Sequence, residues 1–125
     1  MKTLTLDTGA LIALERRRQR VWQVLHRAAT LGVVPIVPAD VVAEWWRGRS
    51  DIRETILGAV SIEPLTADLA RIAGEAMATV RGATTVDAIV MASAAQRGDA
   101  VYTSDVGDLE RLRAFFPSVR IFTVS

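Results

Sequence analysis

The segment from Val86 to Leu109 constrains the fold most strongly, because an apolar helix is followed directly by a turn and a short strand. Apart from Ser93, residues 88–95 are all apolar, and a helix that is apolar on every side is expected to be buried. Gly98 is a typical helix end, and the apolar run at 100–102 suits a strand. The segment therefore predicts a buried helix–strand pair at the centre of the domain.

Two acidic residues flank this apolar pair. Asp87 lies in the first turn of the helix, and Asp105 comes just after the strand. If helix and strand pack in adjacent layers, both carboxylates lie at the same end of them. Like charges held together raise one another's pKa and destabilise the fold. A divalent cation with oxygen ligands removes that repulsion, so we expect a metal at this end.

Strands and helices alternate along the rest of the chain. The sequence predicts strands at 3–6, 33–37, 60–62 and 120–124, and helices at 10–16, 20–31, 39–47, 51–57, between Thr66 and Gly82, and at 109–115. This alternation is typical of parallel sheets with right-handed crossovers. We therefore expect one domain, residues 1–125, with a three-layer α/β/α fold around a mainly parallel sheet of four to five strands.

Composition excludes several classes of protein. The chain has 125 residues, a net charge of +1 and no Cys, so disulfides, thiolate metal sites and a globally basic nucleic-acid surface are excluded. It has no membrane-length apolar run and no recognisable signal peptide, so we expect a cytoplasmic protein without a membrane partner. The arginines of the 16–20 segment are expected to form a solvated face, and an RNA contact there is the weaker interpretation.

Four acids are expected at the edge formed by the strand ends. Asp7 follows the first strand directly, and ligands of parallel sheets bind at the carboxyl ends of the strands. If the first and fourth strands are neighbours, Asp7 lies close to Asp87 and Asp105, and Glu44 lies on a helix that leaves the same edge. Each acid also has an ordinary explanation: Asp7, Asp87 and Asp108 occupy positions typical of helix caps, and Glu44 suits a solvated helix surface.

Oxygen ligands favour Mg²⁺ or Mn²⁺ over Zn²⁺, since the chain has no Cys and only one His, His26. A bound cation of this kind polarises a phosphoryl oxygen and activates water as a nucleophile. The sequence has neither a glycine-rich phosphate-binding loop nor a plausible Ser–His pair. Metal-assisted hydrolysis of a phosphodiester is therefore the reaction that we expect.

Candidate substrate-binding residues follow Glu44. Arg47 and Arg49 are placed either to bind phosphates beside the metal or to complement the dipole of their helix, and the sequence does not separate these interpretations. Trp45 and Trp46 cannot both point inward from adjacent helical positions. One is expected in the core, and the other is available to a partner or to a nucleic-acid base.

The chain resembles the PIN-domain nucleases, and specifically the VapC-type toxins of bacterial toxin–antitoxin pairs. The resemblance covers the whole chain and rests on four motifs: Leu4-Thr5-Leu6-Asp7-Thr8, Pro38-Ala39-Asp40-Val41-Val42-Ala43-Glu44, Val86-Asp87-Ala88-Ile89 and Thr103-Ser104-Asp105-Val106-Gly107-Asp108-Leu109. It implies RNA cleavage that depends on Mg²⁺ or Mn²⁺, a homodimer, and inhibition by a cognate antitoxin protein.

The resemblance also implies roles for individual residues. It implies that Asp7, Asp87 and Asp105 bind the metal. It also implies that these three residues act as catalytic acids together with Glu44 and Asp108. Thr103 matches a hydroxyl residue that steadies the site, and we group it with Arg47 and Arg49 on the substrate side. One departure is Gly9, where many relatives carry a Ser or Asn that supports the water shell of the metal. Thr8 is the candidate replacement for the missing hydroxyl.

Three other classes of protein share parts of this pattern. Aspartyl-phosphate phosphatases need a second Asp two residues after the first, where this chain has Gly9. Phospho-accepting receiver domains need a lysine late in the chain, but Lys2 is the only lysine. A catalytically silent PIN-like scaffold that binds RNA or an antitoxin remains open because of Gly9. We expect a metal-dependent endoribonuclease toxin.

Overall fold

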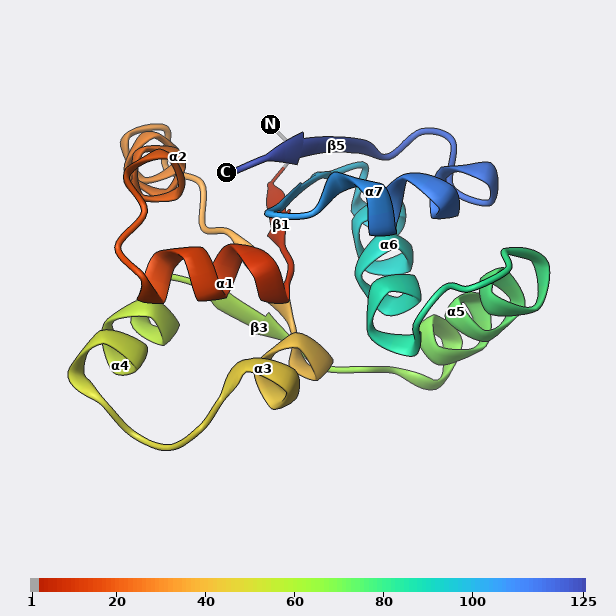
Figure 1. The fold of residues 1–125 in the computed structure, drawn as a ribbon, viewed down its shortest axis with the longest axis horizontal. Helices are drawn as coiled ribbons and strands as arrows, with labels where there is room; N and C mark the ends of the chain where they lie inside the picture. The colour runs from red at the N-terminus through yellow and green to blue at the C-terminus, as the bar shows by residue number, and fades with distance from the viewer. Residues whose placement is uncertain (1–2) are drawn as a thin grey trace.

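A computed structural model describes residues 3–125, and the single lysine, Lys2, lies outside them. In this part of the chain five strands form one sheet in the order β3-β2-β1-β4-β5 (Figure 1), and every neighbouring pair is parallel. The strands are β1 (Leu4–Leu6), β2 (Ile36–Pro38), β3 (Ser61–Glu63), β4 (Ala100–Thr103) and β5 (Arg120–Thr123). The predicted parallel α/β fold is confirmed.

Helices cover both sides of this sheet. They are α1 (Thr8–Glu15), α2 (Gln19–Thr30), α3 (Ala39–Trp45), α4 (Asp51–Gly58), α5 (Ala67–Thr79), α6 (Thr85–Arg97) and α7 (Val106–Glu110), and α7 continues into a short 3₁₀ helix at Arg111–Ala114. Figure 1 shows α1, α2 and α4 on one side of β1, with α5 and α6 on the other. Helix α6 contacts α5 and three strands and is buried from Ala88 to Ala94, as its apolar sequence predicts.

The first and fourth strands are neighbours, as predicted. Leu4 pairs with Ala100, and Leu6 pairs with Tyr102. The amide of Asp7 then donates a hydrogen bond to the Tyr102 carbonyl at 3.3 Å, one residue beyond the end of β1. The carboxyl ends of β1 and β4 therefore form one edge, and we call this edge, with the start of α6, the carboxylate edge.

Two element boundaries differ from those predicted. The strand expected to begin at Val33 begins at Ile36, because the preceding residues complete the end of α2: Gly32 has a φ of +71°, and the Val33 amide donates to the Ala28 carbonyl at 2.8 Å. The helix expected to reach Arg47 ends at Trp45, because Trp46 already has an extended backbone with a ψ of 132°.

Two helix starts and one side chain also differ from the prediction. The first helix, predicted from Ala10, begins at Thr8, and the last helix, predicted from Leu109, begins at Val106. Leu69, Ile72, Ala73 and Ala76 follow the i, i+3, i+4, i+7 spacing of one helix face, which predicts that all four lie inward. Ile72 is nevertheless 39% exposed. Leu69, Ala73 and Ala76 are buried as predicted.

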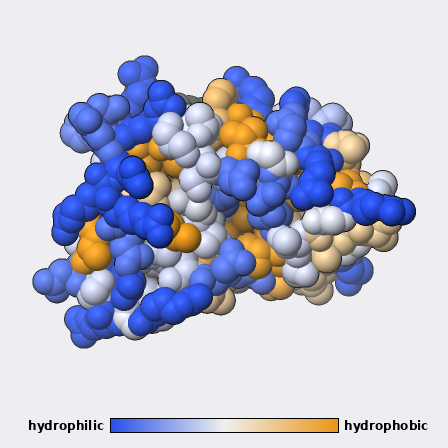
Figure 2. All heavy atoms as spheres, viewed as in Figure 1, coloured by the Kyte–Doolittle hydropathy of each residue, from blue (hydrophilic) through white to orange (hydrophobic). Residues whose placement is uncertain are grey.

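The surface of the molecule divides unevenly between polar and apolar residues. Figure 2 shows hydrophilic side chains over most of the half that holds α2 and α4, with hydrophobic residues gathered more toward the middle and the half that holds α5. The exposed apolar residues include Leu65 and Ile72, just before α5 and within it. Among residues 3–125, no helix is both long enough and apolar enough to cross a membrane.

A buried polar network joins α6 to the sheet. The Asp99 side chain is fully buried, and its Oδ2 accepts hydrogen bonds from the Thr3 hydroxyl at 2.6 Å and from Arg97 Nε at 2.9 Å. Arg97 also forms an ion pair with Glu63 and donates to the Thr5 hydroxyl at 2.7 Å. One guanidinium thus connects β1, β3 and the start of β4, and no pattern in the sequence predicts this network.

Candidate active site

Asp7 is the most deeply buried acid of the carboxylate edge, with 7% of its surface exposed. It is also the N-cap of α1, where its Oδ1 accepts a hydrogen bond from the Ala10 amide at 2.9 Å. The capping explanation is therefore correct. It does not exclude a role in a site, because a carboxylate has further lone pairs beyond the one that the Ala10 amide uses.

The pKa of Asp7 is raised to about 6. Burial is the main cause, because a charged carboxylate is poorly solvated there. Hydrogen bonds from the Thr103 hydroxyl and the Ala10 amide lower the pKa, whereas the negative charges of Asp87 and Glu44 raise it further. The structure thus brings three acids from separate segments of the chain close enough to repel one another.

Asp87 lies in the first turn of α6, where its amide donates to the N-cap hydroxyl of Thr84 at 3.2 Å. Burial raises the pKa of the Asp87 carboxyl, a hydrogen bond from the Thr84 hydroxyl to that carboxyl lowers it, and the charges of Asp108, Glu44 and Asp105 raise it. The carboxyl of Asp87 therefore interacts electrostatically with acids from α3, from the β4–α7 connection and from α7.

Glu44 is exposed on α3, and its carboxylate accepts a short hydrogen bond from the Thr8 hydroxyl. Because Thr8 is the residue after Asp7, this bond holds Glu44 beside the start of α1. Thr8, which from sequence is only a candidate replacement for the hydroxyl missing at Gly9, thus positions an acid.

Asp105 and Asp108 are exposed at the end of the edge formed by β4 and α7. Thr103 is buried, and its hydroxyl accepts a hydrogen bond from the Asp105 amide at 3.0 Å, which orders this connection. Within residues 3–125, however, no three carboxylate or imidazole side chains are grouped closely enough to form a metal site by themselves. Asp105 and Asp108 share the edge with Asp7 and Asp87 but do not complete a compact ligand set.

Gly9 is packed against Ser104. A Cβ atom at residue 9 would lie 2.2 Å from Ser104 Oγ and 3.2 Å from the Ser104 amide nitrogen. The space that a side chain at residue 9 would occupy is therefore filled by the hydroxyl of Ser104, which comes from the β4–α7 connection. The sequence alone could not identify this contact, because the two residues are far apart in the chain.

We expect positions 9 and 104 to be energetically coupled. With Ser104→Gly, the change Gly9→Ala should be stabilising, because alanine favours the helix. With Ser104 present it should be less favourable by roughly 1–3 kcal/mol, the usual cost of overpacking. Urea unfolding of the two single variants and the double variant gives this coupling energy, and a value near zero would contradict the contact.

The two candidate substrate arginines lie in different places. Arg47 lines a hollow of about 440 Å³ between α1 and α3, together with Glu44 and Arg16. Arg49 instead lies near α4, with its Nε 4.0 Å from a carboxylate oxygen of Glu54. Of the two, Arg47 shares a surface with an acid of the carboxylate edge.

Trp45 is the tryptophan of the core, with 4% of its surface exposed, and its Nε1 donates to Glu15 at 2.9 Å. Trp46 is half-buried and packs edge-on against Trp45, with the ring centroids 6.0 Å apart. His26 is exposed on α2.

The pKa of Asp7 predicts how stability depends on pH. Because the folded-state pKa, about 6, lies above the ordinary value of 3.8, ionising Asp7 opposes folding. Without metal, this destabilisation is absent below pH 3.8 and grows as the pH rises through the folded-state pKa, reaching roughly 3 kcal/mol at most. In EDTA, the stability advantage of Asp7→Asn over the parent should therefore shrink between about pH 7.5 and about pH 5. Urea unfolding measures it, and an advantage independent of pH would contradict the shifted pKa.

Comparison with known proteins identifies similar folds. A family model described as the PIN domain matches residues 4–114. Among solved structures, DNA-bound VapBC from Salmonella typhimurium is 15% identical, with 100% of each chain covered and a TM-score of 0.79. VapBC2 from Rickettsia felis, bound to a DNA fragment from its promoter, is 13% identical over 97% of this chain and 98% of that chain, with a TM-score of 0.76. A toxin–antitoxin complex from Klebsiella pneumoniae is 17% identical over 98% of each chain, with a TM-score of 0.71. No curated protein sequence matches the chain significantly.

Proposed function

This chain belongs to the PIN domain family, and we propose that it is a metal-dependent endoribonuclease that acts as the toxin of a toxin–antitoxin pair. One observation carries the enzymatic part of this proposal. Asp7 is buried at the carboxylate edge, its pKa is raised to about 6, and the charges of Asp87 and Glu44 contribute to that shift. A fold retains such repulsion at a cost, and a bound cation accounts for it.

The residues of the edge fit Mg²⁺ or Mn²⁺. Their donors are carboxylate and hydroxyl oxygens, which these hard cations prefer. Because the described residues contain no ready group of three ligands, Asp7 and Asp87 would hold the metal directly, with water in the remaining positions. Mg²⁺ commonly binds in this way. Asp105 and Asp108 would then act through such waters, which keeps them in the proposed acidic set.

A bound metal would polarise a phosphoryl oxygen and activate water for attack in line with the leaving 3′ oxygen. The residues of the chain position the reactants. The Ala10 amide fixes the orientation of Asp7, Thr8 fixes Glu44, and buried Thr103 orders the connection that carries Asp105. We propose that Arg47 binds a phosphate beside Glu44, and that Arg49 contacts more distant backbone.

This mechanism predicts the chemistry of the product ends. Because water, and not the neighbouring 2′ hydroxyl, is the nucleophile that attacks the phosphorus atom, cleavage should leave a 5′ phosphate and a 3′ hydroxyl. The test is cleavage of end-labelled single-stranded RNA with Mn²⁺, followed by mass analysis of the fragments, with an EDTA reaction as the control. A 2′,3′-cyclic phosphate, or equal cleavage in EDTA, would contradict the mechanism.

A catalytically weak or silent scaffold that binds RNA or an antitoxin is the second candidate. The observation that favours it is the lack of three grouped metal ligands among residues 3–125. A comparison of the parent with Asp7→Asn and Asp87→Asn separates the two functions. Equal RNA cleavage by all three proteins would remove the nuclease proposal, whereas RNA binding without cleavage by the parent would establish the scaffold.

We further propose an antitoxin protein as partner, a homodimer as the assembled state and the cytoplasm as the place of action. The first rests on similar structures that are described as VapBC and as a toxin–antitoxin complex. The second is supported by large apolar side chains on the surface: Ile62, Leu65 and Ile72 are between 39% and 44% exposed. The third follows from the proposed substrate, because a toxin that cleaves cellular RNA acts where that RNA is.

A further inference from the structure

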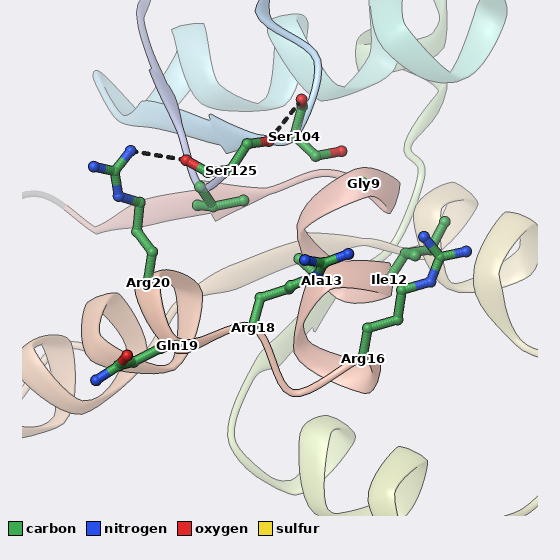
Figure 3. A pocket seen from close by; sticks show the side chains of 10 residues that line it. Gly9, Ile12, Ala13, Arg16, Arg18, Gln19, Arg20, Ser104 and Ser125 are labelled. Carbon is green, nitrogen blue, oxygen red and sulfur yellow. Dashed lines mark hydrogen bonds between the residues drawn. The ribbon is translucent and has the colours of Figure 1, made fainter.

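A second cavity opens beside the carboxylate edge (Figure 3). It has a volume of about 430 Å³ and lies between α1, the turn that leads into α2, and the β4–α7 connection. Gly9 and Ser104 line it. Gly9 is two residues from Asp7, and Ser104 stands between Thr103 and Asp105. One end of the cavity is therefore formed by residues next to these acids in the chain, and its wall continues along α1.

Arginine side chains dominate the polar lining of this cavity. Arg16, Arg18 and Arg20 all contribute to it, and among the described residues no Asp or Glu does. Arg20 donates to the Ser125 carbonyl at 2.9 Å (Figure 3) and so holds one wall. Among residues 3–125, neither Arg16 nor Arg18 makes a side-chain hydrogen bond or an ion pair with any other residue. Two guanidinium groups thus face the cavity with all their donors available.

The backbone places these two arginines around the same cavity by adopting an unfavourable conformation between them. Arg17, between them, has a φ of +59°, and it is the only residue other than glycine with a positive φ in the described chain. Such a conformation is unfavourable for a residue with a long side chain. Its effect is that Arg16 and Arg18 line this cavity, whereas Arg17 lines a different hollow beside Trp22 and Asp51.

We propose that this cavity, which we call the arginine subsite, binds phosphates of the RNA strand next to the position that is cut. The inference rests on the proposed function. Arg16 and Arg18 would each grip a phosphate with their planar forks, and the apolar surface of Ile12 and Ala13 would pack against the attached nucleoside. Arg16 also lines the hollow that holds Glu44 and Arg47. A strand in the subsite can therefore continue toward the acids.

RNA fits this subsite better than an acidic peptide does. The subsite joins the carboxylate edge at Ser104, and a continuous strand has to pass from one to the other for an internal bond to be cut. An acidic peptide that entered along the same path would meet the acids of the edge and be repelled by them. RNA meets the same acids at its reacting phosphate, where the proposed metal neutralises the charge.

The salt dependence of RNA binding tests the subsite. The protein is the full chain carrying Asp7→Asn, so that the RNA is not cut, and the probe is a fluorescent single-stranded RNA titrated at several KCl concentrations. Adding Arg16→Gln and Arg18→Gln should weaken binding by roughly tenfold or more. It should also reduce the slope of log K against log salt by about 1.4, since each phosphate contact of a single strand contributes about 0.7.

The matched control adds Arg27→Gln and Arg120→Gln instead. These arginines line a groove with Thr3, Gly98 and Ala100, at the opposite edge of the sheet, and their replacement removes the same charge. The control should keep the slope of the Asp7→Asn protein. An equal loss of slope in both variants would show that the salt dependence comes from general surface charge, and it would overturn the arginine subsite. A preference of the subsite for an oligoglutamate peptide over RNA would also overturn it.

Cleavage by the parent keeps this test separate from the proposed function. If the parent cleaves RNA and the Arg16→Gln, Arg18→Gln protein binds it with an unchanged slope, the subsite is wrong and the nuclease stands. If the parent neither binds nor cleaves single-stranded RNA, both proposals fail.

Discussion

Replacing Asp7 with asparagine is expected to reduce metal-dependent RNA cleavage at least about 100-fold, because a neutral amide is a poor ligand for a hard cation. The same change should stabilise the metal-free protein at about pH 7.5 by roughly 1–3 kcal/mol, since it removes a buried charge whose pKa is raised to about 6. The side-chain oxygen of the asparagine can still accept the hydrogen bond from Ala10, so the cap of α1 is retained.

The opposite directions of these two effects make the test specific. Replacing a residue that only supports the fold lowers both the stability and the activity of the protein. Replacing a charged residue that is kept for function lowers the activity and raises the stability. Steady-state cleavage with Mn²⁺ and urea unfolding in EDTA measure the two effects, with Asp51→Asn as a control on an exposed acid of α4. Loss of activity together with loss of stability would show that Asp7 is only a cap.

Replacing Arg97 with methionine should lower the free energy of unfolding by roughly 3–5 kcal/mol, because it leaves the charge of a buried carboxylate without its partner. The Asp99 side chain is fully buried, Arg97 lies 2.9 Å from it, and the Arg97 side chain itself is only 20% exposed. Two threonine hydroxyls would remain near Asp99 Oδ2, at 2.6 and 3.1 Å, but they are uncharged.

The matched control is Arg71→Met. Arg71 pairs with Asp68 on α5, and both side chains are highly exposed, at 69% and 85%. Exposed pairs of this kind contribute at most about 1 kcal/mol. Adding Asp99→Leu to Arg97→Met should restore part of the lost stability, since it removes the orphaned charge. Chemical denaturation measures all three variants, and similar losses for Arg97→Met and Arg71→Met would show that the Asp99 network contributes little.

The topology could be predicted because hydrophobic pattern decides it. The helix that precedes Gly98 has no polar side to expose, so it had to lie between other layers, and its strand had to be central. Once β1 and β4 are parallel neighbours, Asp7 and Asp105 lie at the same edge of the sheet, whatever conformations their side chains adopt. That edge, and Asp87 beside it, could therefore be predicted from the order of the elements alone.

Features that depend on atomic distances could not be predicted. The Asp99 network needs Thr3, Glu63 and Arg97 to meet across three elements, and nothing in their local sequence indicates a partner. The contact of Gly9 with Ser104 likewise exists only after folding. One boundary does have a readable signal: Gly32 after the helix allows a left-handed cap, which delays the start of β2.

The acids of the site illustrate both outcomes. Their arrival at one edge follows from topology. Whether they surround a cation depends on rotamers and on water, and the described side chains do not close around one by themselves. Whether Asp7 and Asp87 together bind a divalent metal therefore has to be tested by metal binding itself.

Titration with Mn²⁺ is the direct test of this site, with free Mn²⁺ followed by electron paramagnetic resonance and the melting temperature recorded at each step. The parent should remove Mn²⁺ from solution stoichiometrically and gain thermal stability as it does so, whereas Asp7→Asn and Asp87→Asn should bind far more weakly and gain less. Mn²⁺ uptake and melting temperatures that are the same in the parent and in both variants would contradict a metal site at the carboxylate edge.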